Sequence, residues 1–360
     1  MKVIYNKKPG EIRDYFLILS DITNYEYKTE ELVKKHDYFD KEFKDFYEKN
    51  IDKFKLNEIE LERYFKFYSK DKLNIAGFMI YEKELWAYDN IYEYLDFLEG
   101  LDEEKIKLTA IEEILYLMGE GDDEAKEDEM LKNTPLVLDN IKLLDIHSSI
   151  KWELFCFFQE PLAYFKKFLK FVKELIPLYE DFKNTRDNLM GDLHERMERD
   201  INNNEEAYEF IKKETRGIID LSNFNEIYVS SNYFSSHSIT FAMVDRKIHI
   251  FLGVYYKKAL EILGGIREDK IQLNLMVFKN LSERNRFEII RLLSEDNEYC
   301  HGDIAKLLNI TGATVSYHIN YLCAANLVTM HKKNKNVYYK LNKEVIKNSM
   351  EFLKEEFKLG

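Results

Sequence analysis

The sequence contains few residues that cross-link or interrupt a chain. Its 360 residues include only three cysteines, four prolines and 13 glycines. Three cysteines are too few for a disulfide-stapled secreted module. No uninterrupted apolar run approaches the roughly 18–20 residues that span a bilayer, and the start, MKVIYNKKPGEIRDY, has no apolar core of a secretory signal. We therefore expect a cytoplasmic protein of two or three domains with no membrane partner.

Motifs of the common enzyme classes are also absent. The sequence has no Gly-x-x-x-x-Gly-Lys-Ser/Thr phosphate loop, no Gly-x-Gly-x-x-Gly and no Gly-x-Ser-x-Gly. His194 and Glu195 begin a partial match to the zinc motif His-Glu-x-x-His, but Glu198 stands where the second histidine belongs, so we interpret the stretch as a charged helix face. The acidic residues 119–130 lack EF-hand spacing and are expected to form a solvated connector, with a metal-binding loop as the alternative. We expect neither an enzyme nor a cofactor.

Apolar and aromatic residues are plentiful, which excludes a disordered chain. The sequence is 45% hydrophobic and contains 25 Phe and 25 Tyr. The scarcity of proline predicts long helices over most of the first 215 residues, with one helix ending near Pro177. From residue 221 the texture changes to short β-rich runs at 227–229, 238–244 and 247–251. The last two predict a hairpin.

Net charge divides the chain into two unequal parts. The whole sequence carries −13 at neutral pH, which by itself argues against nucleic acid as a partner, because DNA affinity depends on neutralising phosphates. Residues 271–360 contain 13 Lys and Arg against 10 Asp and Glu, a balance of +3, so residues 1–270 carry −13 − 3 = −16. The short basic part therefore has to be considered separately.

Two short helices are predicted in that basic part. Ser282 is the expected cap of a preceding helix whose apolar face holds Phe287, Ile290 and Leu293. Residues 303–308 predict the first short helix, with Ile304, Leu307 and Leu308 buried. After a tight turn, Thr311 caps the second, which continues to Leu322 and directs Val315, Ile319 and Leu322 inward. This spacing is typical of a helix-turn-helix.

The outward face of the second helix is unusual for a protein surface. It carries small or hydrogen-bonding residues rather than the expected Lys and Glu: Gly312, Ala313, Ser316, Tyr317 and Asn320. A helix that enters a DNA major groove about 12 Å wide needs such side chains. Next, residues 327–330 and 337–341 predict a β-hairpin, and Lys332, Lys333 and Lys335 at its tip suit phosphate or minor-groove contact.

These residues together resemble the winged helix of the ArsR (arsenic-repressor-type) family of bacterial transcription regulators. The similarity covers about 65 residues and says nothing about the first 270. It is carried by 281–286, 289–293, 303–305, the run Thr314-Val315-Ser316-Tyr317-His318-Ile319, 322–328 and 337–341. The chain is thus expected to be mainly α with minor β: a helical N-terminal region with a small antiparallel sheet, then a C-terminal winged helix-turn-helix domain. We divide it into a regulatory or dimerisation region at 1–220, a β-hairpin coupling segment at 221–265 and the DNA-binding domain at 266–360.

The resemblance implies a homodimer that binds double-stranded DNA at a partly palindromic operator, most simply as a repressor. It implies that Ala313, Ser316 and Tyr317 contact bases, that Thr311 and Thr314 lie near the backbone, and that the wing lysines contact phosphates. His318 occupies a position where the family often has His, either structural or base-contacting. Gly312 departs from the family, which often has Gln there, and Asn326 replaces a turn glycine. The candidate DNA-binding residues are Thr311, Gly312, Ala313, Thr314, Ser316, Tyr317, His318, Lys332, Lys333 and Lys335.

The thiolate pairs of metal-sensing family members are missing. Where those members have Cys-x-Cys, this chain has Cys300, His301 and Gly302, and the C-terminal helix expected at 343–357 contains no His. Soft metals need several converging thiolates, so we expect no metal site. A redox switch at Cys300 stays open, and Cys323 is expected to be a buried packing residue.

The N-terminal region must regulate, oligomerise or recruit. Its aromatic density suggests an apolar pocket for an unknown small-molecule effector, with an ordinary hydrophobic core as the alternative. A competing hypothesis is that the acidic region binds a protein partner, or autoinhibits DNA binding by folding over the wing. The candidate effector residues are Trp152, Phe155, Tyr164 and Tyr233, in a group that also includes Phe158, Phe165, Phe168 and Phe234.

Overall fold

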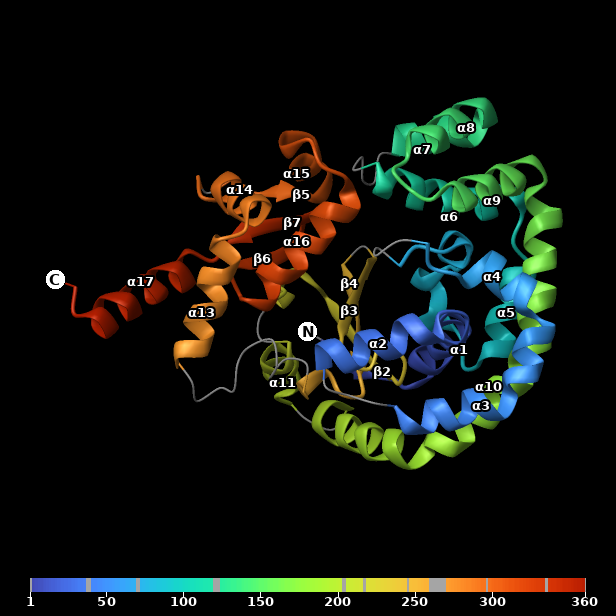
Figure 1. Ribbon diagram of the computed structural model, residues 1–360, viewed down its shortest axis with the longest axis horizontal. Coiled ribbons are helices and arrows are strands. Elements are labelled where there is room, and N and C mark those ends of the chain that lie inside the picture. Colours follow the sequence, from blue (N-terminus) through green and yellow to red (C-terminus); the bar gives the residue numbers. More distant parts are fainter. Residues whose placement is uncertain are drawn as a thin grey trace.

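Helices dominate the structure and two small sheets accompany them, which confirms the expected fold class (Figure 1). The computed structural model describes residues 2–36, 40–68, 72–118, 124–202, 205–215, 218–244, 246–258, 270–295, 297–333 and 336–359. Within these ranges, no helix combines the length and apolarity that a bilayer crossing requires. The predicted boundary at residue 265 lies outside the described residues.

The N-terminal helices surround a small sheet. α10 curves around the outside, and α1 lies directly on the sheet (Figure 1). The helices are α1 (Lys8–Thr23), α2 (Tyr25–His36), α3 (Lys41–Leu56), α4 (Glu58–Phe65), α5 (Ile91–Glu99), α6 (Glu103–Leu117), α7 (Glu124–Lys132), α8 (Thr134–Leu143), α9 (Ser148–Gln159), α10 (Pro161–Met197) and α11 (Ala207–Glu214), with the short turns η1 (Ile75–Phe78), η2 (Glu82–Ala87), η3 (Glu198–Asn202) and η4 (Leu221–Asn223).

The helix expected to end near Pro177 continues instead to Met197. Pro177 lies inside α10, where it removes one backbone donor and favours a bend. Buried side chains on both sides of Pro177 hold the helix together, because Val172 and Phe182 are both fully enclosed. Packing along its whole length therefore outweighs the local cost of the proline.

The sheet joins the two ends of the N-terminal region. Its order is β1-β2-β4-β3, with β1 (Lys2–Tyr5), β2 (Glu226–Asn232), β3 (Ile239–Val244) and β4 (Lys247–Gly253). The β3–β4 hairpin is antiparallel as expected, but β1 pairs with β2 and β2 with β4 in parallel. The sheet is thus mixed rather than antiparallel. Helices α1 to α11 lie between β1 and its partner β2 in the sequence. The division at residue 220 stays a proposal, and the pairing of β1 with β2 joins residues from both sides of it.

The C-terminal part has the order of a winged helix. Helices α15 and α16 follow one another through a tight turn, and the hairpin of the wing, β6 and β7, comes after them and forms a sheet of order β5-β7-β6 with β5, which precedes α15. Asn309 and Asn326 have φ of 53° and 55°, a left-handed conformation that Asn tolerates. The elements are α13 (Lys270–Leu281), α14 (Arg284–Leu293), β5 (Tyr299–Cys300), α15 (His301–Leu308), α16 (Gly312–Ala324), β6 (Val328–Lys333), β7 (Asn336–Leu341) and α17 (Lys343–Phe357).

Three local predictions in this part are wrong. The cap of α14 is Glu283, whose carboxylate accepts from the backbone N–H groups of Asn285 and Arg286, whereas the Ser282 hydroxyl donates to the preceding helix. Leu307 and Phe287 are about half exposed, at 55% and 48%. Each stands two positions from a buried neighbour, Ala305 or Ile289, so apolar content alone could not assign the inner face.

The N-terminal region also extends the wing sheet. Met330 of β6 donates its backbone N–H to the Ile218 carbonyl, and the Asp220 N–H donates to the Met330 carbonyl, both at 2.9 Å. Ile219 and Met330 thereby form a parallel bridge on the edge of β6. The two parts of the chain are held together by backbone hydrogen bonds as well as by side-chain packing.

Candidate nucleic-acid interface

The helix expected to enter DNA is capped and anchored as its sequence predicts. The Thr311 hydroxyl accepts from the Thr314 N–H at 3.2 Å and is hydrogen-bonded to the Thr314 hydroxyl at 2.8 Å. Val315, Ile319 and Leu322 are fully buried. These contacts fix the rotation of α16, so its other residues have defined directions.

The outer face of α16 remains available only in part. Tyr317 is 52% exposed and packs edge-on against Tyr321, with ring centroids 5.0 Å apart. Asn320 is exposed too. Ser316 is half-buried and Gly312 is buried. For Ala313 the structure places the backbone in the helix but not the side chain, so its role stays a prediction.

His318 faces the protein. It is buried, its Nδ1 lies 3.5 Å from a Glu283 carboxylate oxygen, and its Nε2 lies 3.3 Å from the Asn285 amide nitrogen. Burial lowers the pKa of His318, and the neighbouring Glu283 opposes that shift. This location favours the structural alternative, in which His318 ties α16 to the start of α14.

The wing is the expected hairpin, but its strands reach further than predicted, so Lys332 and Lys333 lie in β6 rather than in the turn. Lys332 pairs with Val337 and Lys333 with Asn336 in the antiparallel ladder of β6 and β7. Lys335 lies outside the described residues. The strands place Lys332 and Lys333 next to the turn of the hairpin. This backbone position is consistent with phosphate contact, which stays a prediction.

A residue of the N-terminal region, Tyr116, contacts the N-terminal end of α16, the helix expected to enter DNA. The Tyr116 hydroxyl, at the end of α6, is hydrogen-bonded to Ser316 Oγ at 2.5 Å. Ser316 Oγ also lies 3.0 Å from His301 Nε2. The Tyr116 and His301 rings stack, with centroids 4.8 Å apart and planes 18° apart. A candidate base-contacting side chain is therefore already engaged within the chain.

The glycine at position 312 is explained by the same contact. A Cβ built there would lie 2.9 Å from the Tyr116 carbonyl oxygen, 2.9 Å from His301 Cε1 and 3.3 Å from the Leu117 carbonyl oxygen. Two of these three neighbours are backbone atoms, which cannot rotate away. The departure from the family noted at Gly312 thus coincides with the place where α6 approaches most closely.

The cysteines do not form a metal centre in the described part of the chain. No cluster of three or more His, Cys, Asp and Glu side chains suitable for a metal occurs among the described residues. Burial raises the pKa of Cys323 to about 12 and also raises the pKa of Cys300. Cys323 is buried as expected, and an inert thiol is typical of a packing residue.

The four candidate effector residues lie in different surroundings. Trp152 is 66% exposed. The Tyr164 hydroxyl donates to Glu153, and its ring packs against Tyr64 and Phe157, while Phe155 lies half-buried nearby in sequence on α9.

Tyr233 belongs to a separate aromatic cluster. It is buried, donates to Asp40, and packs with Phe182 around the Arg186 guanidinium. Tyr164 and Phe182 are 18 positions apart on α10, about 27 Å of helix at 1.5 Å per residue. The packing therefore does not bring these four residues together around a single pocket.

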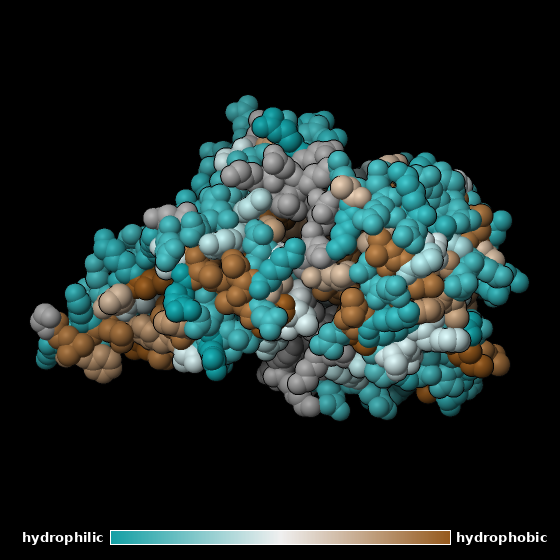
Figure 2. All heavy atoms as spheres, turned by 90° about the horizontal axis from the view of Figure 1, so that it is seen from above, coloured by the Kyte–Doolittle hydropathy of each residue, from teal (hydrophilic) through white to brown (hydrophobic). Residues whose placement is uncertain are grey.

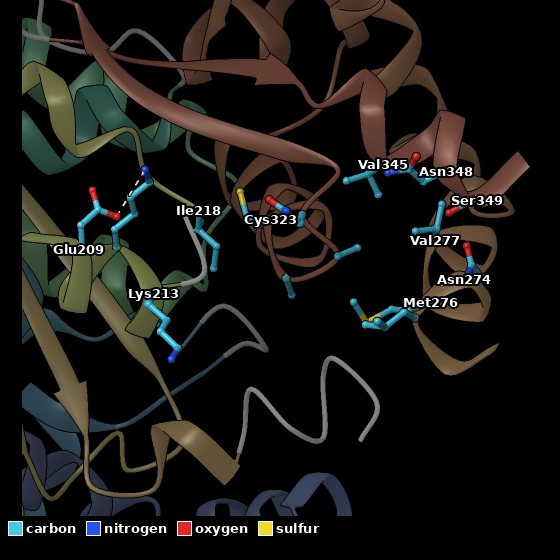
Figure 3. A pocket seen from close by; sticks show the side chains of 15 residues that line it. Glu209, Lys213, Ile218, Asn274, Met276, Val277, Cys323, Val345, Asn348 and Ser349 are labelled. Atoms are coloured by element: carbon cyan, nitrogen blue, oxygen red, sulfur yellow. Dashed lines mark ion pairs between the residues drawn. The ribbon is translucent and has the colours of Figure 1, made fainter. Parts of the chain in front are cut away.

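A cavity of about 680 Å³ lies where the two parts of the chain meet (Figure 3). α11 and Ile218 form one side, the end of α16 with Cys323 forms the floor, and α13 and α17 form the other side. Its lining residues are Glu209, Lys212, Lys213, Ile218, Leu273, Asn274, Met276, Val277, Cys323, Ala324, Ala325, Asn326, Val345, Asn348 and Ser349.

Apolar side chains gather on the outer faces of α13 and α17. Figure 2 shows them as a brown group at the narrow end of the molecule. Single exposed apolar residues are ordinary, but five on these two adjacent helices, with a sixth just beyond the end of α17, form a patch of the kind that marks an interface. They are Ile271, Leu273 and Leu275 of α13, Met350 and Phe357 of α17, and Leu359 after it, and Leu273 also lines the cavity.

Sequence reasoning missed the contribution of the N-terminal region to this surface. Tyr116 belongs to a helix that was expected, but no sequence pattern links it to Ser316, two hundred positions away. Gly312 was the one signal, because a glycine at a position that should contact bases requires an explanation from close packing.

Comparisons with known proteins agree with the geometry. Residues 283–330 match the profile of the family described as "Bacterial regulatory protein, arsR family". The chain is 40% identical over 74 residues to the cadmium resistance transcriptional regulatory protein CadC of Listeria innocua, covering 21% of this chain and 62% of that protein. It is 35% identical over 77 residues to the transcriptional repressor SdpR of Bacillus subtilis, covering 21% of this chain and 84% of that protein.

A third relative shows the same extent of similarity. The arsenical resistance operon repressor of Bacillus subtilis is 35% identical over 69 residues, which cover 19% of this chain and 66% of that protein. The chain thus spans 62% of the length of the cadmium-resistance regulators it matches. The similarity is confined to about a fifth of the chain.

Proposed function

This chain belongs to the ArsR family of bacterial regulatory proteins, and from that premise we propose that it is a sequence-specific DNA-binding transcriptional regulator, acting in the cytoplasm as a repressor. The observation that carries the proposal is α16: a capped helix with a fully buried inner face and an outer face of small and hydrogen-bonding residues. Such a helix, followed by a hairpin with lysines near its tip, suits the major groove and the flanking phosphates.

The binding unit is a homodimer. The exposed apolar residues of α13 and α17 support this step, because they lie together on two neighbouring helices of the winged-helix part. A second copy of the same surface would cover them in a two-fold contact. Two copies of α16 would then bind the two halves of a partly palindromic operator.

The N-terminal region regulates this unit. A small-molecule effector is one route, and the cavity between α11, α13, α16 and α17 supports it better than the aromatic residues do, because its walls come from both parts of the chain. The alternative is control by the acidic N-terminal region itself, which the Tyr116–Ser316 contact favours.

The proposal is tested by selection of DNA from a random-sequence duplex pool with the full-length protein. The selected duplex is then titrated against Tyr317→Ala, which removes an exposed side chain from α16. We expect a loss of about 1–3 kcal/mol for each base contact removed. Tyr92→Ala, an exposed tyrosine on α5, is the matched control and should bind as the unaltered protein does. Equal affinities of all three proteins would place DNA recognition elsewhere.

A further inference from the structure

The end of α6 and DNA require the same space around α16. An α-helix with its side chains is about 10–12 Å across, and the major groove is about 12 Å wide. A groove that accommodates α16 therefore has no room for a second helix against the first turn of α16. Yet the Tyr116 hydroxyl of α6 is hydrogen-bonded to Ser316, at the start of the second turn, and the Tyr116 carbonyl oxygen lies beside Gly312 in the first turn.

We propose that this structure is the closed form of the regulator, in which α6 of the N-terminal region blocks α16 and DNA binding requires α6 to withdraw. The inference rests on the proposed DNA-binding function and specifies how that function is controlled. It differs from an effect of the acidic charge on the wing, because the contact lies on the base-contacting helix and is made by a tyrosine and by backbone atoms.

The electrostatics of the two helix ends favour the closed form. The C-terminal end of a helix carries partial negative charge on its last carbonyl groups, and the N-terminal end of a helix carries partial positive charge. The Tyr116 and Leu117 carbonyl oxygens, which end α6, lie next to Gly312, which begins α16. In a complex with DNA, a helix N-terminus offers the same positive end to a phosphate. The end of α6 thus takes the place of an anion there.

The side chains around the contact are arranged to hold it. Tyr116 is stacked on His301, and both are hydrogen-bonded to the Ser316 hydroxyl. Ser316, one of the residues expected to contact a base, thus has its hydrogen-bond partners within the chain. Gly312 completes the fit, since any side chain there would collide with the α6 backbone.

The contact is also small enough to be released. Tyr116 keeps 41% of its surface exposed, and the contacts between α6 and α16 described above come from Tyr116 and Leu117, the last two residues of α6. Separately, Ile218 and Asp220 attach the N-terminal region to strand β6, a different element of the winged helix. The α6 contact can therefore open while the two parts of the chain stay joined.

Two substitutions open the contact from opposite sides. Tyr116→Ala removes the hydrogen bond and the ring stack from α6, whereas Gly312→Ala places a methyl group against the α6 carbonyls from α16. Each full-length variant should bind the duplex selected from the random pool about 10-fold more tightly than the unaltered protein, within the range usual for coupling between sites. Tyr92→Ala should leave the affinity unchanged. Tyr116→Phe, which keeps the stack, should give a smaller gain.

Hydrogen exchange supplies a readout that needs no DNA. Backbone amides of α16 should exchange faster in Tyr116→Ala than in the unaltered protein, with the amides of β2 and β4 unchanged as evidence that the fold persists. Equal affinity of the unaltered protein, Tyr116→Ala and Tyr116→Phe for the selected duplex would overturn the closed-form inference and leave the DNA-binding function standing. If no duplex is selected even with Tyr116→Ala and Gly312→Ala, the proposed function fails, and the inference fails with it.

Discussion

Ile219 and Met330 face each other in a parallel β-bridge that adds the segment after α11 to the free edge of the wing strand β6. The bridge is made by two backbone hydrogen bonds of 2.9 Å, which depend on no side chain. It also covers part of an edge that would otherwise be available for pairing with another chain.

Removal of one donor should loosen this attachment. Asp220 has φ of −74°, which proline adopts without strain, so Asp220→Pro deletes the N–H that donates to the Met330 carbonyl. We expect a loss of about 0.5–1.5 kcal/mol in unfolding free energy and faster hydrogen exchange at the Met330 amide. Asp220→Ala keeps the N–H and lacks the same carboxylate, so it is the matched control. Identical exchange in both variants would show that the bridge does not hold the two parts together.

The wing lysines should determine the salt dependence of DNA binding. Lys332 and Lys333 end strand β6, and each phosphate neutralised by a lysine contributes about 0.9 to the slope of log affinity against log salt concentration. The double variant Lys332→Gln with Lys333→Gln should lower that slope by about 1–2 and weaken binding to all sequences alike. Titrations of the selected duplex and of an unrelated duplex at several salt concentrations measure both effects. A change restricted to the selected duplex would instead indicate base contact by the wing.

The apolar patch on α13 and α17 should determine the oligomeric state. Leu275 is half exposed on α13, and Leu275→Glu would place a charge in the apolar patch that a second copy should bury. We expect a shift from dimer to monomer in light scattering coupled to gel filtration. Leu56→Glu, at the exposed end of α3, is the matched control and should leave the dimer intact. A protein that is monomeric before any substitution would contradict the proposed homodimer.

His249 should make the N-terminal region sensitive to acid. Burial, and to a smaller extent Lys247, lowers the pKa of His249 to about 4, where its ring lies against Trp86 and Tyr228. Between about pH 6.5 and pH 4 the unfolded chain binds a proton at His249 that the folded chain does not bind. The stability that neutral His249 contributes is thus present above pH 6.5 and is lost as the pH falls toward 4.

The size of this effect can be measured by replacement of the ring. His249→Phe keeps an aromatic ring beside Trp86 and cannot be protonated. We expect its unfolding free energy to fall less than that of the unaltered protein between pH 6.5 and pH 4, by about 1–3 kcal/mol after allowance for solvent screening. Urea titrations across this pH range give the comparison. Parallel pH curves for the two proteins would exclude His249 as the sensitive group.

Local sequence patterns predicted the winged helix well because its elements are determined by neighbours in the chain. Thr311 forms the cap expected of it, and Val315, Ile319 and Leu322 face the core as the helical period requires. Asn326 adopts the left-handed turn in place of glycine. The errors at Ser282, Leu307 and Phe287 concern which of two adjacent residues caps a helix or faces inward.

Long-range contacts could not be predicted in the same way. The parallel pairing of β1 with β2 joins Lys2 to Glu226, and nothing in either strand specifies the other. Pro177 predicted a helix end that tertiary packing overrode. The Tyr116–Ser316 contact likewise depends on how two distant helix ends meet. The candidate site was therefore located from the sequence, but its occupation by α6 required the structure.

The strand order has a consequence for the newly made chain on the ribosome. β1 is synthesised before the helices of the N-terminal region, and its partner β2 emerges more than 220 residues after it, roughly 10–45 s later at usual rates of translation. The sheet that supports the N-terminal helices is complete once β4 has emerged at Gly253, whereas α16 begins only at Gly312. α6 and the sheet that supports it are thus synthesised before α16. The helix proposed to block α16 can therefore be folded before α16 itself is made.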